Sequence, residues 1–239
     1  MNETVDFGFS DIPLAEKKQR VGEVFSNVAA YYDRMNDFMS FGLHRVWKST
    51  TALLLQVNPG MQVLDIASGS GDMAQRLAPR AGERNITMTD INADMLALAR
   101  RRLPAARAIL ANGESLPFAS GSFDRVIIAF GLRNVTQRQH LLNEIHRVLK
   151  IGGKYGILEF SPLGHFPQAQ QFYLTRVLPQ VGNCVANDSA SYRYLGESIL
   201  RFPPPEQLSA MLTTAGLPAA RINKFAGGAV CLHHGDRLY

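Results

Sequence analysis

The stretch of sequence that decides the fold reads Asp65-Ile66-Ala67-Ser68-Gly69-Ser70-Gly71-Asp72. It follows a short apolar run at 61–66 and precedes a helical pattern at 72–77, so it connects a predicted strand to a predicted helix. Residues 69–74 match the pattern G-x-G-x-x-G/A, in which glycine lets the backbone approach a ligand at a helix N-terminus. Several unrelated cofactors bind such turns, so the pattern alone predicts a cofactor site without identifying the cofactor.

Two aspartates beside this turn distinguish between the cofactors. Asp65 stands four residues before Gly69, where a dinucleotide would place its pyrophosphate and S-adenosylmethionine its sulfonium and ammonium groups. A carboxylate repels the first and attracts the second. Asp90 ends the next predicted strand, where its carboxylate can accept hydrogen bonds from both ribose hydroxyls. The pair favours S-adenosylmethionine, the alternative being that both are ordinary turn residues at strand ends.

Further cofactor contacts are expected along the same edge of the sheet. Gly69 and Gly71 would give backbone access, and Ser70 would offer a nearby hydroxyl. The dipeptide Asn112-Gly113 follows the third predicted strand and would face adenine, unless it forms only an ordinary turn. Ala129, near the end of the fourth strand, would pass beside the methionine moiety.

Strands and helices alternate on either side of the turn. The expected elements of this region are a strand at 61–66, a helix at 72–77, a strand at 85–90, a helix from Asn92 to near Leu103, strands at 106–111 and 123–130, a helix capped by Thr136 and a strand at 154–160. Helices near 167–182, 189–201 and 205–215 follow, and then a hairpin of strands at 219–225 and 229–234. We therefore predict an α/β fold of the class I methyltransferase (Rossmann-like) type. Its seven-stranded sheet would be mostly parallel, with the last strand antiparallel and helices on both faces.

A single domain is expected over 1–239, because a chain of 239 residues can bury a full core. Its expected parts are an N-terminal tail at 1–20, an N-terminal helical cap at 21–57, the cofactor-binding core at 61–160, a helical insertion covering the substrate at 161–202, and a C-terminal helix and strand pair at 203–239. Hydrophobic residues make up 46% of the chain and charged residues 19%, which is ordinary for a globular protein.

The charge and the cysteines exclude several classes of function. The net charge is +5, but the basic residues are scattered apart from Arg100-Arg101-Arg102, which closes a predicted helix, so we expect no nucleic-acid partner. Cys184 and Cys231 lack the spacing of a zinc site or a disulfide framework. The N-terminus carries acidic residues and no apolar run, and no stretch approaches the ~18 apolar residues of a transmembrane helix, so a cytoplasmic location is expected.

Longer motifs carry a specific family resemblance. They are Tyr32-Asp33-Arg34-Met35-Asn36-Asp37-Phe38-Met39-Ser40-Phe41-Gly42-Leu43-His44-Arg45-Val46-Trp47; Phe130-Gly131-Leu132-Arg133-Asn134-Val135; Arg147-Val148-Leu149-Lys150-Ile151-Gly152-Gly153 with Glu159-Phe160-Ser161; Ala186-Asn187-Asp188-Ser189 with Tyr192-Arg193-Tyr194-Leu195; and Leu232-His233-His234-Gly235. From about Val21 to the C-terminus, the chain resembles the ubiquinone/menaquinone biosynthesis C-methyltransferases. Ser68, Ile151 and Ala129 depart from the family's usual Gly, Pro and Ser, which leaves only a backbone contact to expect at Ala129.

The resemblance implies methyl transfer from S-adenosylmethionine to a ring carbon of a polyprenyl hydroquinone. The acceptor would be demethylmenaquinol, 2-polyprenyl-6-methoxy-1,4-benzoquinol or both. The alternatives are a cofactor-binding scaffold subunit of a quinone-biosynthesis assembly and a C-methyltransferase of another small phenolic acceptor. A prenyl tail would also imply transient contact with the membrane surface, peripheral to its inner face. The oligomeric state stays open, a homodimer included.

Carbon methylation of a hydroquinol needs a ring activated by loss of a phenolic proton and a site that holds the phenolate. Arg133 and Asn134 follow the fourth strand at the edge where open α/β sheets bind ligands. We expect Arg133 to lower the phenol pKa and Asn134 to orient the ring, the alternative being a surface arginine paired with an acid. Asp188 is a candidate base or a helix N-cap, and Tyr192 could relay a proton or line the ring pocket. His44 is a second candidate base, although a neighbouring core tryptophan favours a structural role.

The histidines do not indicate a metal site. His233 and His234 point to opposite faces of a predicted strand, and His140 and His146 lack i,i+4 spacing, so we expect a metal-free transfer. Apolar residues of the N-terminal and inserted helices could admit a prenyl tail or simply form core: Phe38, Met39, Phe41, Phe166, Phe172, Tyr173, Leu174, Val177 and Leu178.

Overall fold

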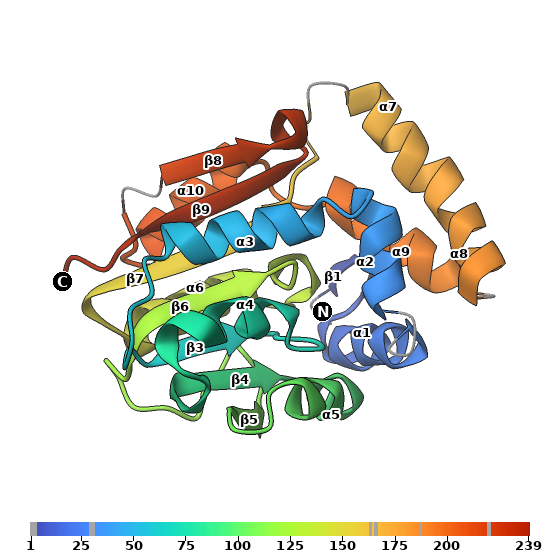
Figure 1. Ribbon diagram of the computed structural model, residues 1–239. Coiled ribbons are helices and arrows are strands. Elements are labelled where there is room, and N and C mark those ends of the chain that lie inside the picture. Colours follow the sequence, from blue (N-terminus) through green and yellow to red (C-terminus); the bar gives the residue numbers. More distant parts are fainter. Residues whose placement is uncertain (1–3, 29–31, 163, 165–166, 187, 219–220) are drawn as a thin grey trace.

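The computed structural model describes residues 4–28, 32–162, 164, 167–186, 188–218 and 221–239. Its main sheet has the strand order β5-β4-β3-β6-β7-β9-β8 (Figure 1). The strands are β3 (Val63–Ile66), β4 (Ile86–Asp90), β5 (Arg107–Leu110), β6 (Phe123–Ala129), β7 (Leu149–Phe160), β8 (Arg221–Phe225) and β9 (Val230–Asp236). Strands β3 to β7 pair in parallel, while β9 runs antiparallel to both β7 and β8. This arrangement confirms the predicted fold.

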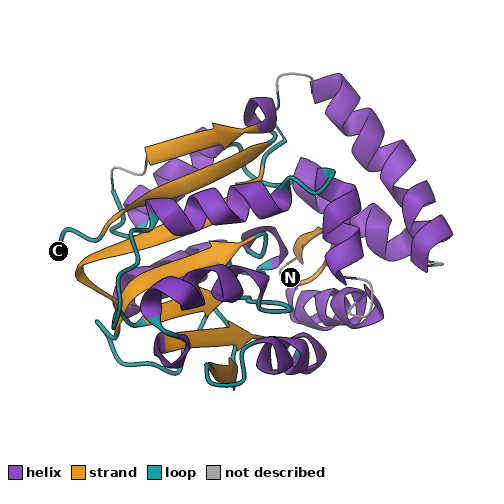
Figure 2. Ribbon diagram, viewed as in Figure 1, coloured by secondary structure: helices purple, strands orange, loops and turns teal. Residues whose placement is uncertain are grey.

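Helices cover both faces of the sheet, as Figure 2 shows in purple against the orange strands. The helices of one face are α3 (His44–Leu54), α4 (Asp72–Ala81) and α5 (Ala93–Arg102), and those of the other are α6 (Arg138–Val148) and α10 (Pro205–Thr214). The central strand β3 is buried along its whole length, so its apolar side chains enter the core on both faces. Leu64 and Ile66 pack towards α6 and α10, while Val63 packs towards α3 and α4.

The two predicted helix caps have opposite outcomes. The Asn92 side chain accepts the N–H groups of Asp94 and Met95 at 2.9 and 3.0 Å, which confirms it as the N-cap of α5. The predicted cap at Thr136 is wrong, because α6 begins after Gln137 without a side-chain cap. Instead, Glu114 accepts the N–H groups of Thr136 and Gln137 at 2.9 and 3.0 Å. A carboxylate from a distant segment therefore fixes the backbone just before this helix.

The N-terminal segment is ordered, where the sequence predicted a tail. It forms a hairpin of β1 (Thr4–Phe7) and β2 (Ser10–Pro13), and α1 (Leu14–Val28) begins well before the expected helix at 21. Asp6 binds Lys17 of α1 at 3.1 Å and Arg138 at 2.8 Å, and the Phe7 ring stacks on Tyr194 at 4.3 Å. Arg138 and Tyr194 lie far along the chain, so the local sequence does not indicate these two contacts.

A layer of helices lies beyond the carboxyl ends of the parallel strands (Figure 1). It comprises α2 (Tyr32–Ser40), α7 (Pro167–Phe172), a π-helical stretch (Tyr173–Val177), α8 (Leu178–Ala186) and α9 (Ser189–Leu200). Met39, Leu174 and Leu178 belong to its core, so these three proposed channel residues are core residues here. By contrast, the side chains of Phe38, Phe41 and Phe172 are exposed. Phe166 and the first two residues of the strand expected at 219–225 lie outside the described residues.

Strand β7 begins at Leu149, earlier than the expected start at 154. Its pairing with β6 shifts register between Phe123 and Arg125, and Gly152 has a φ of 75°. Gly152 thus lies at an irregularity within one long strand. In the described ranges, no helix is both long and apolar enough to cross a membrane.

Candidate active site

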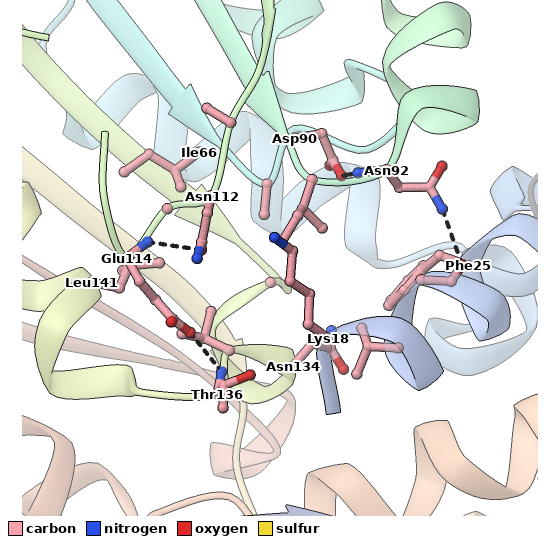
Figure 3. Close-up of a pocket in the computed structure, with 18 of the residues that line it drawn as sticks. Lys18, Phe25, Ile66, Asp90, Asn92, Asn112, Glu114, Asn134, Thr136 and Leu141 are labelled. Atoms are coloured by element: carbon pink, nitrogen blue, oxygen red, sulfur yellow. Dashed lines mark hydrogen bonds between the residues drawn. The ribbon is translucent and has the colours of Figure 1, made fainter. Parts of the chain in front are cut away.

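A cavity of about 270 Å³ lies at the carboxyl edge of the sheet (Figure 3). It is bounded by the ends of β3, β4 and β6, by the segment after β5, and by α1. Five predicted site residues line it together: Gly69, Asp90, Asn112, Gly113 and Asn134. The remaining seven do not line it: Asp65, Ser70, Gly71, Ala129, Arg133, Asp188 and Tyr192. The predicted cofactor and acceptor residues therefore meet at one cavity, but only in part.

The turn after β3 is shaped by left-handed backbone. Gly69 has a φ of 56° and Gly71 a φ of 80°, conformations that side chains disfavour. A Cβ at Gly71 would also lie 3.1 Å from the Cβ of Ala99 on α5. Ser70 is buried, and its hydroxyl accepts a hydrogen bond from Arg102 at 3.3 Å. The glycines thus let the turn close against α5 and begin α4 at Asp72.

Asp65 is buried behind this turn, with 1% of its surface exposed. Its Oδ2 accepts the N–H of Ala74 at 3.0 Å, while Oδ1 has no hydrogen-bond partner within the described residues. Burial raises the pKa of this carboxyl to about 7, against the opposing charge of Lys48. A buried carboxylate with an unused acceptor fits a cationic group such as an ammonium.

Asp90 ends β4 and lines the cavity. Its Oδ2 accepts the N–H of Gly69 and its Oδ1 that of Asn92, both at 2.8 Å. Each carboxylate oxygen therefore keeps acceptor capacity for a hydroxyl, as a ribose requires. Burial raises the pKa of Asp90, and the backbone hydrogen bonds oppose that rise.

The segment after β5 forms a second wall. The Oδ1 of Asn112 accepts the N–H of Glu114 at 3.0 Å, so the residue makes the turn that was the alternative to a binding role. Both functions remain compatible, because the amide nitrogen takes no part in that turn. A Cβ at Gly113 would lie 2.7 Å from Leu141 and 3.1 Å from Ile66, so glycine is required here by close packing.

Ala129 itself does not line the cavity, but the two residues after it do. Phe130 has a φ of 58° and Gly131 continues the wall. The Phe130 ring is buried against Trp47 and Phe160, with ring centroids 6.4 and 4.7 Å apart. The sequence motif contained Phe130, but only the backbone turn after β6 shows that the residue lines the cavity.

Arg133 is buried and paired with an acid that sequence reasoning did not single out. Its Nη1 lies 2.8 Å from Oε1 of Glu159, at the end of β7, and its guanidinium lies 5.5 Å from the Phe160 ring centroid. Arg133 is thus paired with an acid, as the alternative to a phenolate-binding role stated, although that alternative placed the pair on the surface and the structure buries it. Asn134 does line the cavity, and its Oδ1 accepts the Tyr194 hydroxyl at 3.1 Å.

The two candidate proton carriers of the helical layer stand away from the cavity. Asp188 accepts the N–H of Ser191 at 2.9 Å and is the N-cap of α9. Tyr192 is buried against Gly182, and its hydroxyl has no partner within the described residues. Burial, and then the nearby Asp188, raises the Tyr192 pKa. His44 contacts Asp37 at 3.0 Å, outside the cavity, and burial lowers its pKa.

Helix α1 forms the roof of the cavity, which sequence reasoning missed. The Lys18 side chain extends from it into the cavity (Figure 3), and Gly22 and Phe25 line the same space. The Asn92 amide donates to the carbonyl of Gly22 at 3.1 Å, and Lys17 donates to that of Val135 at 3.4 Å. The helix is thus attached on both sides of the cavity. No cluster of metal-ligating side chains occurs in the described part of the chain.

Comparisons with known proteins agree on one family. The model of the ubiE/COQ5 methyltransferase family matches residues 14–237. The ubiquinone/menaquinone biosynthesis C-methyltransferase UbiE of Stenotrophomonas maltophilia (strain R551-3) is 45% identical, covering 98% of this chain and 96% of that protein. The protein of the same name from Bordetella parapertussis is 48% identical, covering 99% and 94%.

Solved structures share the fold at low sequence identity. A Thermotoga maritima S-adenosylmethionine-dependent methyltransferase, described as a possible histamine N-methyltransferase, superposes with a TM-score of 0.69. It is 16% identical, and the match covers 91% of this chain and 99% of that one. A putative methyltransferase in complex with the Haloferax volcanii Trm112 activator gives a TM-score of 0.65 at 17% identity, covering 90% and 98%. At these identities the likeness concerns the fold alone.

Proposed function

The chain belongs to the ubiE/COQ5 methyltransferase family, and we propose that it methylates a ring carbon of a polyprenyl hydroquinone. The acceptor is demethylmenaquinol, 2-polyprenyl-6-methoxy-1,4-benzoquinol or both. The names of relatives that are 45% and 48% identical over nearly the whole chain carry this proposal. The cavity supports it, because it combines a cofactor turn with an apolar wall at the end of β6.

S-adenosylmethionine is the methyl donor, and when bound it supplies an electrophilic methyl group on a sulfonium. We propose that the turn at 65–72 holds its methionine half, with the unused acceptor of Asp65 towards the ammonium. Asp90 would accept from the ribose hydroxyls, and Asn112 and Gly113 would border the adenine. The backbone hydrogen bonds from Gly69 and Asn92 to Asp90 support its role, since they fix the carboxylate at the cavity wall.

The acceptor ring would lie against Phe130 and Asn134. Phe130, Gly131 and Val135 line the cavity, and a ring placed against them would displace water, which strengthens any hydrogen bond made inside. The Asn134 carbonyl is held by Tyr194, so its amide group is left to donate to a phenolate oxygen. Arg133 would add a positive potential from behind the wall, reduced by Glu159 at 2.8 Å.

Asp188 and Tyr192 do not line the cavity, so we propose that they take part in proton removal only if the helical layer moves towards it. In the structure Asp188 caps α9, and Tyr192 belongs to the core of that layer. The Tyr192 hydroxyl has no hydrogen-bond partner among the described residues, so it is not already engaged by another side chain there. Asn134 and Arg133 therefore stand nearer to the proposed chemistry than either of them.

We also propose a cytoplasmic enzyme that contacts the inner face of the membrane transiently. A polyprenyl substrate partitions into lipid, so the enzyme must meet it there. The exposed rings of Phe38, Phe41 and Phe172 support such contact. Phe41 lies 5.5 Å from Tyr173 between ring centroids, which joins the corner after α2 to the inserted helices.

One assay tests the proposed reaction. The purified chain is incubated with methyl-labelled S-adenosylmethionine and short-chain demethylated quinones, each both reduced and oxidised. We expect label in the ring of a reduced quinol and none in the oxidised form, because only the reduced ring can lose a phenolic proton. Cofactor binding without ring methylation of any reduced quinol would contradict the proposal.

A further inference from the structure

A buried lysine joins α3 to the start of the cofactor turn's helix. Lys48 is 4% exposed, and its Nζ lies 2.8 Å from Oδ2 of Asp72. Asp72 is the first residue of α4 and directly follows Gly71. Lysine is almost never fully buried unless it is paired, because its charge loses hydration. The position of this charge therefore needs an explanation.

Neutralising Asp72 is not a sufficient explanation. Arg76 also binds that carboxylate, and the Nδ1 of His44 lies 3.7 Å from it and the Nη1 of Arg102 3.9 Å. Burial opposes the charge of Asp72, yet Lys48 and the neighbouring cations hold its pKa below the ordinary value. Asp72 would thus keep cationic partners without Lys48.

The second carboxylate near Lys48 has fewer partners. Asp65 is opposed in its charged form by burial and by the like charges of Asp90 and Asp72, and it is favoured by Lys48 and the N–H of Ala74. Lys48 binds Asp72 at 2.8 Å and Asp65 accepts the N–H of Ala74 at 3.0 Å, so both side chains contact the first turn of α4. Lys48 is the cation whose charge lowers the Asp65 pKa. The same ammonium lies 5.6 Å from the Phe130 ring centroid, so it sits between the turn and the wall beside β6.

We propose that Lys48 is a positioning residue for the methionine end of the cofactor. Through Asp72 it fixes the first residue of α4, and across the turn it supplies the positive charge that lets Asp65 meet the ligand's ammonium as a carboxylate. This inference rests on the proposed placement of S-adenosylmethionine at 65–72. It requires no direct contact between Lys48 and the ligand.

The proposal has a definite pH signature. An ammonium is held by the ionised form of Asp65, so affinity is retained above the carboxyl's pKa, about 7, and lost as the pH falls through it. Removing Lys48 removes an influence that lowers this pKa, so the loss begins at a higher pH. Two other carboxyl groups influence Asp65. The pKa of Asp72 lies below the ordinary value of an aspartate, and the pKa of Asp90 lies above it. His44 faces Asp72, and burial and then Lys48 lower its pKa.

The test measures binding of S-adenosylhomocysteine by calorimetry from pH 6 to 8.5. This ligand keeps the ammonium and undergoes no transfer. The variants are Lys48→Met, Lys48→Arg and, as a matched control, Arg76→Met, which removes a different cation from Asp72. We call the pH at which half of the maximal affinity is lost the half-loss point. For Lys48→Met we expect the half-loss point to move to higher pH. Affinity at pH 6.5 should fall about tenfold for each unit of that displacement. Lys48→Arg should restore the wild-type profile, and Arg76→Met should leave the half-loss point unchanged.

Three outcomes would overturn the proposal. They are a Lys48→Met profile parallel to that of the wild type, an equal displacement in Arg76→Met, and failure of Lys48→Arg to restore the profile. If the wild type bound no S-adenosylhomocysteine at any pH, the placement of the cofactor would fail first, and this inference with it. Thermal unfolding checks each variant. If Lys48→Met does not fold, Lys48→Gln takes its place, because its amide can still donate to Asp72 while carrying no charge.

Discussion

Oε1 of Glu159 lies 2.8 Å from Nη1 of Arg133, and the two side chains are 2% and 4% exposed. Oε2 of the same carboxylate accepts the backbone N–H of Arg133 at 3.2 Å. The end of β7 therefore fixes both the main chain and the side chain of a residue that follows β6. A buried pair of this kind adds little net stability, but losing one partner leaves a charge uncompensated in the interior.

The first prediction concerns folding stability. We expect Glu159→Met and Arg133→Met each to lower the free energy of unfolding by about 3–5 kcal/mol, because each leaves its partner charged and buried. The double variant should lose much less than the sum of the two. Urea unfolding of the four proteins measures this coupling, and strictly additive losses would show that the pair does not interact.

Arg133→Met should also separate catalysis from cofactor binding. We expect quinol methylation to fall about 100-fold or more, since a positive charge behind the phenolate site is lost. The dissociation constant for S-adenosylhomocysteine should stay nearly unchanged. Arg125→Met is the matched control: this buried arginine bonds the carbonyl of Leu55 at 2.6 Å and lies at the other end of β6. Equal loss of turnover in both variants would point to general destabilisation.

Asp65→Asn should stabilise the ligand-free protein at neutral pH while abolishing cofactor binding. The folded-state pKa of about 7 lies above the ordinary 3.8, so the folded state holds this proton more tightly than the unfolded state. Wild-type stability must therefore fall as the pH rises from about 4 to 7, and the deficit above pH 7 is on the order of 4 kcal/mol, at about 1.4 kcal/mol per unit of pKa. Urea unfolding at pH 5 and pH 8 measures it. An unchanged pH dependence in Asp65→Asn would disprove this origin.

Asp90→Ala should weaken S-adenosylhomocysteine binding by about 10- to 100-fold, the loss expected for hydrogen bonds to a charged acceptor. It also removes the acceptor that fixes the N–H of Gly69 at 2.8 Å. Asp124→Ala serves as the control, because Asp124 accepts the N–H of Gln62 at 2.8 Å at the opposite edge of the sheet. Calorimetry measures the dissociation constant of S-adenosylhomocysteine for both variants. Undiminished affinity in Asp90→Ala would show that Asp90 does not bind the ribose hydroxyls.

Gly113→Ala should cost stability and cofactor affinity through one contact. Its Cβ would lie 2.7 Å from Cδ1 of Leu141, closer than packed atoms tolerate, and we expect a loss of about 1–3 kcal/mol. Leu141→Val removes that methyl group. The double variant should therefore recover part of the affinity lost in Gly113→Ala. If it recovers none, the clash is not the cause.

The succession of strands and helices along the chain and the cofactor edge could be predicted from local patterns. A glycine turn between an apolar strand and a helix, with Asp65 before it and Asp90 at the next strand end, needs only short-range periodicity to be recognised. The Asn92 cap is equally local, since it bonds the N–H groups two and three residues later. Such features depend on residues that are close together in the chain, so the sequence alone is enough to recognise them.

The partners of the buried charges were decided only by the tertiary structure. Glu159 meets Arg133 because β6 and β7 pair in parallel, and Lys48 reaches Asp72 because α3 packs beside α4. Glu114 binds the backbone just before α6, 22 residues further along the chain. Helix α1 closes the cavity for the same reason, through contacts to segments far along the chain. A charge in the interior must find an opposite charge, but which one it finds depends on how strands and helices pack, and no local periodicity records that choice.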